Sequence, residues 1–428
     1  MDRRRFLRTA MGSAVTLLAL DACSRESGGE GGSFAVPSSA TTEPEVAIDV
    51  LGGDEIVVDV QTHLLEYDRS IPLGNGFFGS GFPQAECGEG DPRDCFTTER
   101  WRDLVFDKSD TRLAVLSAIP VVGDVDPLSI EVMEDARRKV EEVCDDSSVL
   151  VQGHAVPNVG DFAAARERML QMSEEHDLAA WKVYTHAGPG FRLDDADPEG
   201  LPVGQSFLDT VRDSGVPIVA VHKGLSGNDK WASPSDIGPA AAANPDIDFL
   251  VYHSGYESRE GSVDERPGEG INRLIDSLSA VGIGRGDNVY AELGSTWRRA
   301  MSDVDEAADV LGKLLLAVGE DRILWGTDSL WYGSPQDQIQ AFRAFQISEE
   351  YQERFGYPAL TDEVKAKILG GNALALHGID AAEIGCVTTR EAREDARMHG
   401  EPDRLLGPDS VEQARALFRS EHPWFFRA

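Results

Sequence analysis

Four side chains that can bind a metal ion or transfer a proton each come shortly after a short apolar run. They are His63, His222, His253 and Asp328, and the runs before them cover residues 56–60, 217–221, 249–252 and 323–325. Neutral imidazole nitrogens and a carboxylate are suitable ligands for a divalent ion such as Zn²⁺. An ion with one open position lowers the pKa of bound water toward ~7 and so makes it a nucleophile. Taken singly, each histidine is more simply a hydrogen-bonded loop residue and Asp328 a helix N-cap. The metal hypothesis therefore requires all four to meet.

The chain repeats a unit that would bring these residues together: an apolar run, a loop and a helical pattern. Eight such runs occur, at 56–60, 113–119, 149–156, 179–184, 217–221, 249–252, 289–293 and 323–325. Several are β-branched and apolar on both faces, as in a buried parallel sheet. Eight strands alternating with helices predict an α/β fold, a (β/α)8 TIM barrel over residues 48–380. A doubly wound sheet is the alternative, but the Gly-rich turn expected after its first strand is missing.

Composition excludes several classes of protein. The chain has 428 residues, of which 41% are hydrophobic and 27% charged, so it is neither a polytopic membrane protein nor a disordered chain. With 75 acidic and 40 basic residues its net charge is −35, which disfavours nucleic acid and anionic lipid as partners. The five cysteines form no CxxC pair. Cys87 and Cys95, eight residues apart in one predicted loop, either form a disulfide or remain free thiols.

The first 22 residues have the layout of an export signal. A basic start precedes an apolar run at 11–20, shorter than the ~20 residues needed to span a bilayer. The stretch 4–8, Arg-Arg-Phe-Leu-Arg, is similar to the twin-arginine signal that exports folded proteins. Cys23 ends a string similar to a lipoprotein cleavage box, with Asp21 as a departure from it. We therefore expect the protein in the cell envelope, with membrane contact only through a lipid on Cys23.

Two further segments flank the predicted barrel. Residues 23–47 are rich in Gly, Ser, Thr, Glu and Pro, lack hydrophobic periodicity and are predicted to be a flexible linker. Residues 381–428 are predicted to be a C-terminal extension with short helices and an apolar end that packs on the barrel.

Short strings at the ends of the predicted strands carry a resemblance to a known family. They cover residues 57–63, 220–222, 251–253, 324–328 and 368–373. In these strings the chain resembles the amidohydrolase superfamily, in particular the amidohydrolase-related branch that includes the aminocarboxymuconate-semialdehyde-type decarboxylases. The resemblance extends from about residue 54 to residue 378.

This resemblance implies a metal site and its ligands. His63, His222 and Asp328 match family ligands of one divalent ion, which we expect to be Zn²⁺, with Mn²⁺ or Fe²⁺ as alternatives. Gln61 stands where the family has the first histidine of a His-x-His pair, and its amide oxygen would be a weaker ligand. The resemblance also implies that Asp328 is the general base and that His253 stabilises an oxyanion or donates a proton. If Gln61 abolishes metal binding, the site is an inactive relic.

Three more residues at the ends of predicted strands are candidates for binding substrate or orienting ligands: Lys182, His186 and Glu292. A strand-4 lysine that is carboxylated and bridges two metals occurs in other branches of the superfamily, but a two-metal site would also want both first-strand histidines. A strand-7 glutamate is typical of retaining glycosidases, yet the strand-4 glutamate that would pair with it is absent.

The function we expect is an exported metal-dependent hydrolase that cleaves an amide, lactone or ester bond of a small molecule. A metal-dependent decarboxylase of the same branch is the first alternative, and a non-catalytic ligand-binding barrel is the second. Barrels of this branch are often dimers, so the resemblance also implies a homodimer.

Overall fold

The computed structural model describes residues 29–34 and 51–384, apart from 71–77, 83–86, 88–89, 122, 124–125, 145–147, 159, 259–260 and 262–265. The predicted export signal, Cys23 and residues 385–428 of the predicted extension lie outside these residues and remain predictions. Within the described residues, no helix is both long enough and apolar enough to span a membrane.

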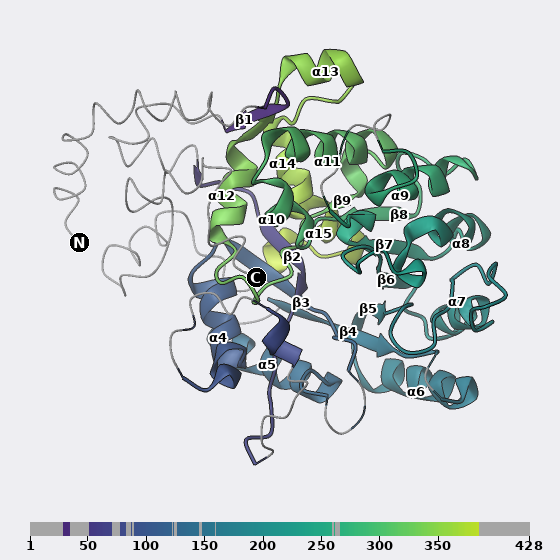
Figure 1. Ribbon diagram of the computed structural model, residues 1–428. Helices are drawn as coiled ribbons and strands as arrows, with labels where there is room; N and C mark the ends of the chain where they lie inside the picture. The colour runs from purple at the N-terminus through teal and green to yellow at the C-terminus, as the bar shows by residue number, and fades with distance from the viewer. Residues whose placement is uncertain are drawn as a thin grey trace, which may run out of the picture.

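Eight parallel strands, β2 to β9, form one sheet in chain order (Figure 1). They are β2 Val57–Thr62, β3 Thr111–Leu116, β4 Val149–Ala155, β5 Leu178–Val183, β6 Ile218–His222, β7 Asp248–Tyr252, β8 Val289–Glu292 and β9 Ile323–Leu324. Each overlaps one of the eight apolar runs in the sequence. The last strand returns to the first: Val60 N donates to Trp325 O at 3.0 Å, and Thr62 forms a parallel bridge with Ser329. The predicted barrel is confirmed, and the doubly wound alternative is wrong.

Helices surround the strands (Figure 1). They are α4 Thr98–Arg102, α5 Ile130–Cys144, α6 Phe162–Glu175, α7 Gly204–Asp213, α8 Ile237–Ala243, α9 Gly270–Ser279, α10 Thr296–Ala300, α11 Val304–Ala317, α12 Gln336–Ala344, α13 Glu349–Phe355, α14 Asp362–Ala366 and α15 Asn372–His377. Helix α11 begins with an acidic cap. Asp303 accepts hydrogen bonds from the backbone amides of Asp305 and Glu306 at the start of α11, where otherwise unpaired N–H groups need partners.

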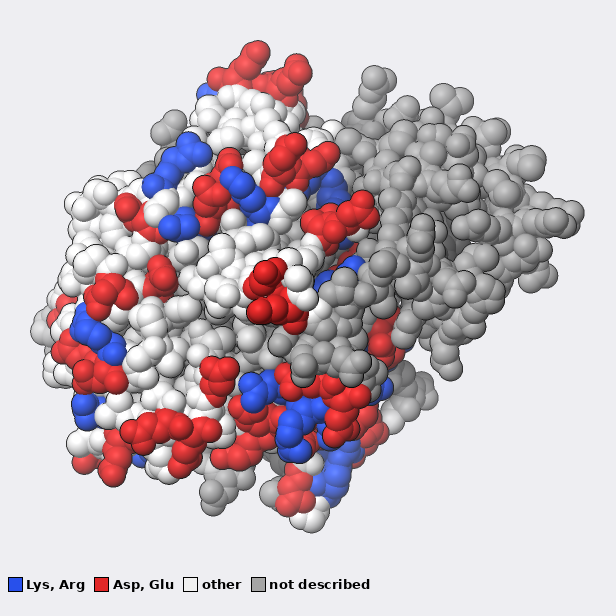
Figure 2. All heavy atoms as spheres, turned by 180° about the vertical axis from the view of Figure 1, so that it is seen from behind, with Lys and Arg blue, Asp and Glu red and all other residues white. Residues whose placement is uncertain are grey.

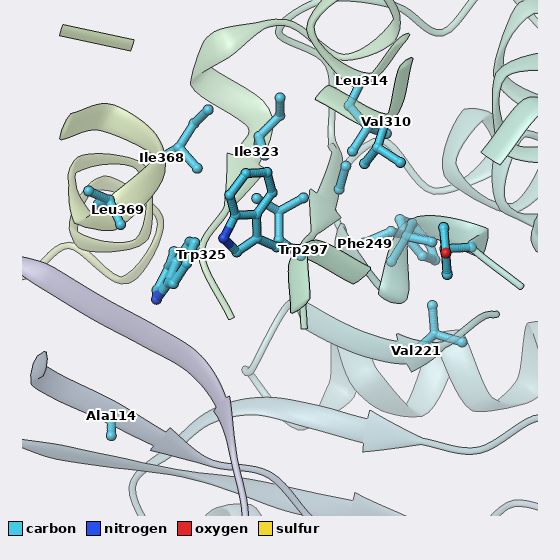
Figure 3. Packing of buried hydrophobic residues seen from close by; sticks show 14 of the residues in the cluster. Ala114, Val221, Phe249, Trp297, Val310, Leu314, Ile323, Trp325, Ile368 and Leu369 are labelled. Carbon is cyan, nitrogen blue, oxygen red and sulfur yellow. The ribbon is translucent and has the colours of Figure 1, made fainter. Parts of the chain in front are cut away.

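Large apolar side chains fill the space between the sheet and the helices. Trp325, directly after β9, is fully buried and packs against Phe342 of α12, with 5.2 Å between ring centroids. Figure 3 shows Trp325 next to Trp297, with Ile368 and Leu369 of the segment before α15 on its other side. This cluster holds the closing strand in place, because β9 has only two residues and few ladder bonds of its own.

The linker prediction for residues 23–47 is wrong at Gly32–Phe34. These residues form strand β1, which pairs antiparallel with β10 Phe345–Ile347. The Phe34 ring lies 5.5 Å from that of Phe345, and a Cβ on Gly32 would lie only 2.5 Å from the same ring. This segment has no hydrophobic periodicity. It is held instead by the ring of Phe34 and by the close packing of the Gly32 backbone against Phe345. Residues 23–28 and 35–47 lie outside the described residues, so the linker prediction stays a prediction there.

Two expectations about surface chemistry can be compared with the structure. Cys87 and Cys95 form a disulfide, with 5.2 Å between their Cα atoms, which confirms the first of the two alternatives.

Figure 2 shows one face of the molecule, on which Asp and Glu side chains are spread widely with Lys and Arg among them. The negative charge is thus distributed over this face rather than gathered at a single site.

A buried charge cluster joins three segments at the amino-terminal ends of the strands. Arg343 of α12 donates from Nε to Glu55 Oε1 at 2.6 Å and from Nη1 to Asp110 Oδ2 at 2.5 Å. Glu55 precedes β2 and Asp110 precedes β3. This end of a TIM barrel typically serves stability rather than chemistry.

We predict that Arg343→Met destabilises the protein strongly, because it leaves two carboxylates without their buried partner. The free energy of unfolding, measured by denaturant titration, should fall by about 3–5 kcal/mol. The matched control is Arg212→Met, which removes a pair with Asp246 whose side chains are 40% and 51% exposed. That change should cost about 1 kcal/mol or less. Equal losses in the two variants would contradict a structural role for the cluster.

Candidate active site

The structure brings the four predicted residues to the carboxyl-terminal rim of the barrel as two contacting pairs. His63 follows β2 and Asp328 follows β9, with His63 Nε2 lying 3.0 Å from Asp328 Oδ1. His222 ends β6 and His253 follows β7, with 3.2 Å between His222 Nδ1 and His253 Nε2. In a barrel this rim carries the chemistry.

His63 is fixed in one orientation and one tautomer. Its Nδ1 lies 2.6 Å from the carbonyl oxygen of Ser117, which can only accept, so Nδ1 carries the hydrogen. The other ring nitrogen, Nε2, therefore faces Asp328. The ring is buried and stacks on Trp331 at 5.3 Å between centroids. Histidines that bind metals are commonly held in this way, with one ring nitrogen donating to a carbonyl group and the other nitrogen facing the ion.

Asp328 caps no helix in the described part of the chain, which excludes the simpler interpretation of this residue. Its φ is 60°, in the left-handed region that non-glycine residues rarely adopt. Ser295 Oγ donates to Asp328 Oδ2 at 2.6 Å, and Trp331 Nε1 donates to Oδ1 at 3.2 Å. Burial by itself raises the pKa of Asp328, but the contacts with His63 and Ser295 outweigh it and lower the pKa to about 2. The carboxylate is therefore ionised at neutral pH.

The two histidines of the other pair are neutral. His253 Nδ1 donates to the carbonyl oxygen of Gly294 at 2.7 Å, so its Nε2 accepts from Nδ1–H of His222. Burial lowers the pKa of His253 to about 4, and desolvation by surrounding side chains lowers that of His222 well below its usual range. The other ring nitrogen of His222, Nε2, is thus left with a lone pair.

Glu292 lies behind His253, where it supports the backbone of the site. Its carboxylate accepts from the backbone N of His253 at 3.0 Å and from that of Gly294 at 2.5 Å. Burial raises the pKa of Glu292 to about 8. A Cβ on Gly326 would lie 1.7 Å from Glu292 Oε1, so a side chain at this position would displace the Glu292 carboxyl group. Of the two predicted roles for Glu292, the structure favours orienting a histidine.

Lys182 has a different environment from the other candidates. It is fully buried on β5, and its Nζ lies 3.6 Å above the ring centroid of Tyr252. Nζ has no hydrogen-bond partner. Burial lowers the pKa of Lys182 to about 7, although the charges of Glu292 and Asp328 act against this.

His186 is only partly buried, at the edge of the same group. Its ring lies 4.8 Å from that of His222, and its Nδ1 is buried without a hydrogen-bond partner. Its position beside His222 is compatible with a contact to substrate at the rim.

Two residues of the site were missed from the sequence. Asp59 on β2 is buried and accepts from the backbone N of Thr327 at 3.0 Å and from the Thr327 hydroxyl, which positions the residue before Asp328. Burial raises the pKa of Asp59 to about 7. Ser295, which binds Asp328, follows β8. A charged residue within an apolar run was a signal for Asp59, whereas a serine in a Gly-Ser-Thr loop gave none.

The family resemblance implies a divalent ion at this site. Whether the site fits such an ion depends on which atoms it offers as ligands. His63 Nε2, the outer nitrogen of His222 and the ionised Asp328 carboxylate are donors of the right type. Among the described residues, however, no three His, Cys, Asp or Glu side chains converge as a ready cage. Gln61 Nε2 donates to Asp328 Oδ1 at 3.1 Å and lies 3.5 Å from His63 Nε2. The donor chemistry fits an ion, and the amide nitrogen of Gln61 lies among the donors.

Solved structures with a similar backbone come from enzymes that act on small organic acids. A 2,6-dihydroxybenzoate decarboxylase complexed with 2,6-dihydroxybenzoate is 16% identical, with a TM-score of 0.41 over 76% of this chain and 98% of that chain. A 5-carboxyvanillate decarboxylase from Novosphingobium aromaticivorans, complexed with manganese and 4-hydroxy-3-methoxy-5-nitrobenzoic acid, is 11% identical, with a TM-score of 0.44 over 81% and 99%. A 4-oxalomesaconate hydratase from Rhodopseudomonas palustris is 13% identical, with a TM-score of 0.41 over 76% and 96%. Similarity at this level carries no information about the reaction of this chain.

Comparison with curated protein sequences gave no match. Comparison with protein families matches residues 58–379 to the family described as Amidohydrolase. The match covers well over half of the chain and includes every residue of the two pairs, together with Gln61, Lys182 and Glu292. The chain therefore belongs to the amidohydrolase family.

Proposed function

We propose that the chain is a carboxy-lyase of the amidohydrolase family that removes CO₂ from a small organic acid. The observation that carries the proposal is the buried ammonium group of Lys182, which has no hydrogen-bond partner. Burying an unpaired charge is costly, so a group of this kind is best explained by an anionic partner that arrives with the substrate. The Tyr184 ring lies 4.9 Å from Lys182 Nζ and 5.1 Å from the His222 ring, which supports a position of Lys182 in the site.

The expected hydrolysis of an amide, ester or lactone gives Lys182 no such partner. Those bonds are neutral, and a neutral oxygen would satisfy the ammonium group less well than a carboxylate. Nothing else in the site favours hydrolysis over decarboxylation. We therefore prefer the decarboxylase alternative, with hydrolysis as an outcome of the experiment below.

In the proposed reaction the bond between the substrate carbon and its carboxylate breaks, and the electron pair stays on carbon. CO₂ leaves, and the carbon takes up one proton. That proton comes from a substrate hydroxyl by way of Asp328, because both nitrogens of His253 are hydrogen-bonded and the free lone pair of His222 is a ligand position for the ion. Asp328, ionised and fixed by Ser295, can accept a proton from a substrate hydroxyl.

A divalent ion bound by His63, His222 and Asp328 would supply stabilisation of negative charge on a substrate oxygen. Zn²⁺, Mn²⁺ and Fe²⁺ are the ions to be compared. Export to the cell envelope is part of the proposal, and the Cys87–Cys95 disulfide supports it because disulfides persist in oxidising compartments.

The first experiment measures two products from one panel of substrates. Hydroxybenzoates and other aromatic carboxylates are incubated with the protein and each ion, and CO₂ release is followed alongside acid release from neutral esters, lactones and amides. We expect CO₂ from at least one carboxylate and no acid from the neutral panel. Acid release without CO₂ would establish a hydrolase. Binding of a carboxylate without turnover in any condition would favour the non-catalytic barrel. Asp328→Asn should abolish turnover while retaining most substrate affinity.

We predict that the affinity for a carboxylate substrate falls as the pH rises above 7. The pKa of Lys182 is about 7 without a partner, so the ammonium form prevails below this pH and is lost above it. KM should therefore increase above pH 7 in the wild-type protein.

Lys182→Met should raise KM about 10-fold or more at pH 6, as expected for loss of a charged hydrogen bond, and should remove the increase above pH 7. The control is Lys230→Met, whose side chain is 50% exposed and pairs with Glu199. A parallel increase of KM with pH in the Lys182→Met variant would contradict the assignment.

A further inference from the structure

Gln61 lies at the closing seam beside His63 and Asp328, and its side chain is an amide rather than an imidazole or a carboxylate. It lies on β2 two residues before His63 and is 1% exposed. Its Nε2 donates to Asp328 Oδ1 at 3.1 Å and lies 3.5 Å from His63 Nε2. The same Asp328 oxygen lies 3.0 Å from His63 Nε2. An amide N–H group therefore points at the two atoms that a cation would have to bind.

The other end of the Gln61 amide is unsatisfied. Its Oε1 is buried and has no hydrogen-bond partner. A Cβ on Gly294 would lie 2.2 Å from Gln61 Oε1 and 2.5 Å from Glu292 Oε1, so the two oxygens border the same small space. An amide N–H in that space would have the Glu292 oxygen within reach as an acceptor.

These contacts allow two orientations of the Gln61 amide group. One orientation occupies the place of the ion, and the other leaves that place open to it. In the present orientation the amide N–H group donates to Asp328 Oδ1 and so partly neutralises the carboxylate that would otherwise attract an ion. After rotation by half a turn, Oε1 would face the same pair as a third acceptor, and Nε2 would face Glu292. A cation and the amide N–H cannot occupy the place beside Asp328 Oδ1 together, because both need the lone pairs of that oxygen.

We infer that Gln61 is an internal competitor of the divalent ion: its amide N–H holds the His63–Asp328 pair until an ion displaces it. The chain's affinity for the ion is set by this exchange rather than by the ligand types alone. The inference rests on the proposed function in placing an ion at this site, but its test needs no substrate.

The experiment titrates Mn²⁺ and Zn²⁺, separately and without substrate, into the purified full chain by isothermal calorimetry, with Mn²⁺ binding also followed by electron paramagnetic resonance. The variants are Gln61→Met, which keeps the length of the side chain but removes the donor, and Gln61→Glu, which replaces the donor by a carboxylate. We expect Gln61→Met to bind the ions more tightly than wild type. Gln61→Glu should gain about 10-fold or more over wild type, the scale on which groups around a metal site change its affinity.

The matched control is Gln152→Met. Gln152 is a second glutamine inside the barrel, 1% exposed on β4, and its Nε2 donates to Tyr252 Oη at 2.7 Å. Its variant tests the loss of a buried amide that does not touch His63 or Asp328, and should leave ion affinity unchanged. Thermal unfolding of each variant without ion checks that the fold is kept.

Weaker ion binding by Gln61→Met would overturn the inference and make Gln61 a ligand through its amide oxygen. Equal binding by Gln61→Met and wild type would also overturn it, since removal of a competitor must raise affinity. The same holds if neither Gln61 variant binds an ion at any concentration tested. None of these outcomes bears on whether a carboxylate substrate is turned over, so failure of this inference and failure of the proposed reaction are distinguishable.

Discussion

Closure of the sheet between β2 and β9 is the constraint on which the site depends. β9 has only two residues, so the seam is held by bonds that continue beyond the strand, including Asp328 N to Gln61 O at 2.9 Å and His63 N to Ser329 O at 2.6 Å. These bonds join residues more than 260 positions apart and set His63 directly against Asp328. Asp59, bound to Thr327, adds a side-chain contact across the same seam. The barrel and its chemistry are thus closed by the same few residues.

Burial then gives the groups around this seam different charges. Burial lowers the pKa of His253 to about 4 and raises that of Glu292 to about 8, so both favour their neutral forms at pH 7. Asp328 behaves differently because His63 and Ser295 counteract the effect of burial. The result is a fixed negative charge on Asp328 near the neutral imidazoles of His222 and His253, which is a suitable electrostatic setting for either an ion or a proton transfer.

The sequence predicted the strands better than the contacts between side chains. All eight apolar runs overlap strands of the barrel. Short runs that are apolar on both faces are typical of strands in a parallel sheet, which is buried on both sides. The positions of His63, His222, His253 and Asp328 after strands followed from the same pattern. The direction in which each side chain turns did not. The left-handed φ of 60° at Asp328 and of 64° at His253 depends on tertiary packing and has no sequence signal. Ser295 and the docking of Gly32–Phe34 were missed for the same reason, since each depends on a partner far away in the chain.

Strand β1 also shortens the distance at which a lipid on Cys23 would hold the enzyme. With Gly32–Phe34 paired to β10, the described chain starts at Gly29, only six residues after Cys23. At most ~3.6 Å per residue, those positions span about 20 Å, whereas a free linker to residue 47 would span about 85 Å. The barrel would then stay close to the lipid surface, with its mouth in a restricted range of orientations. For a substrate that crosses or partitions into the membrane, such an enzyme would work as a surface catalyst rather than as a freely diffusing one.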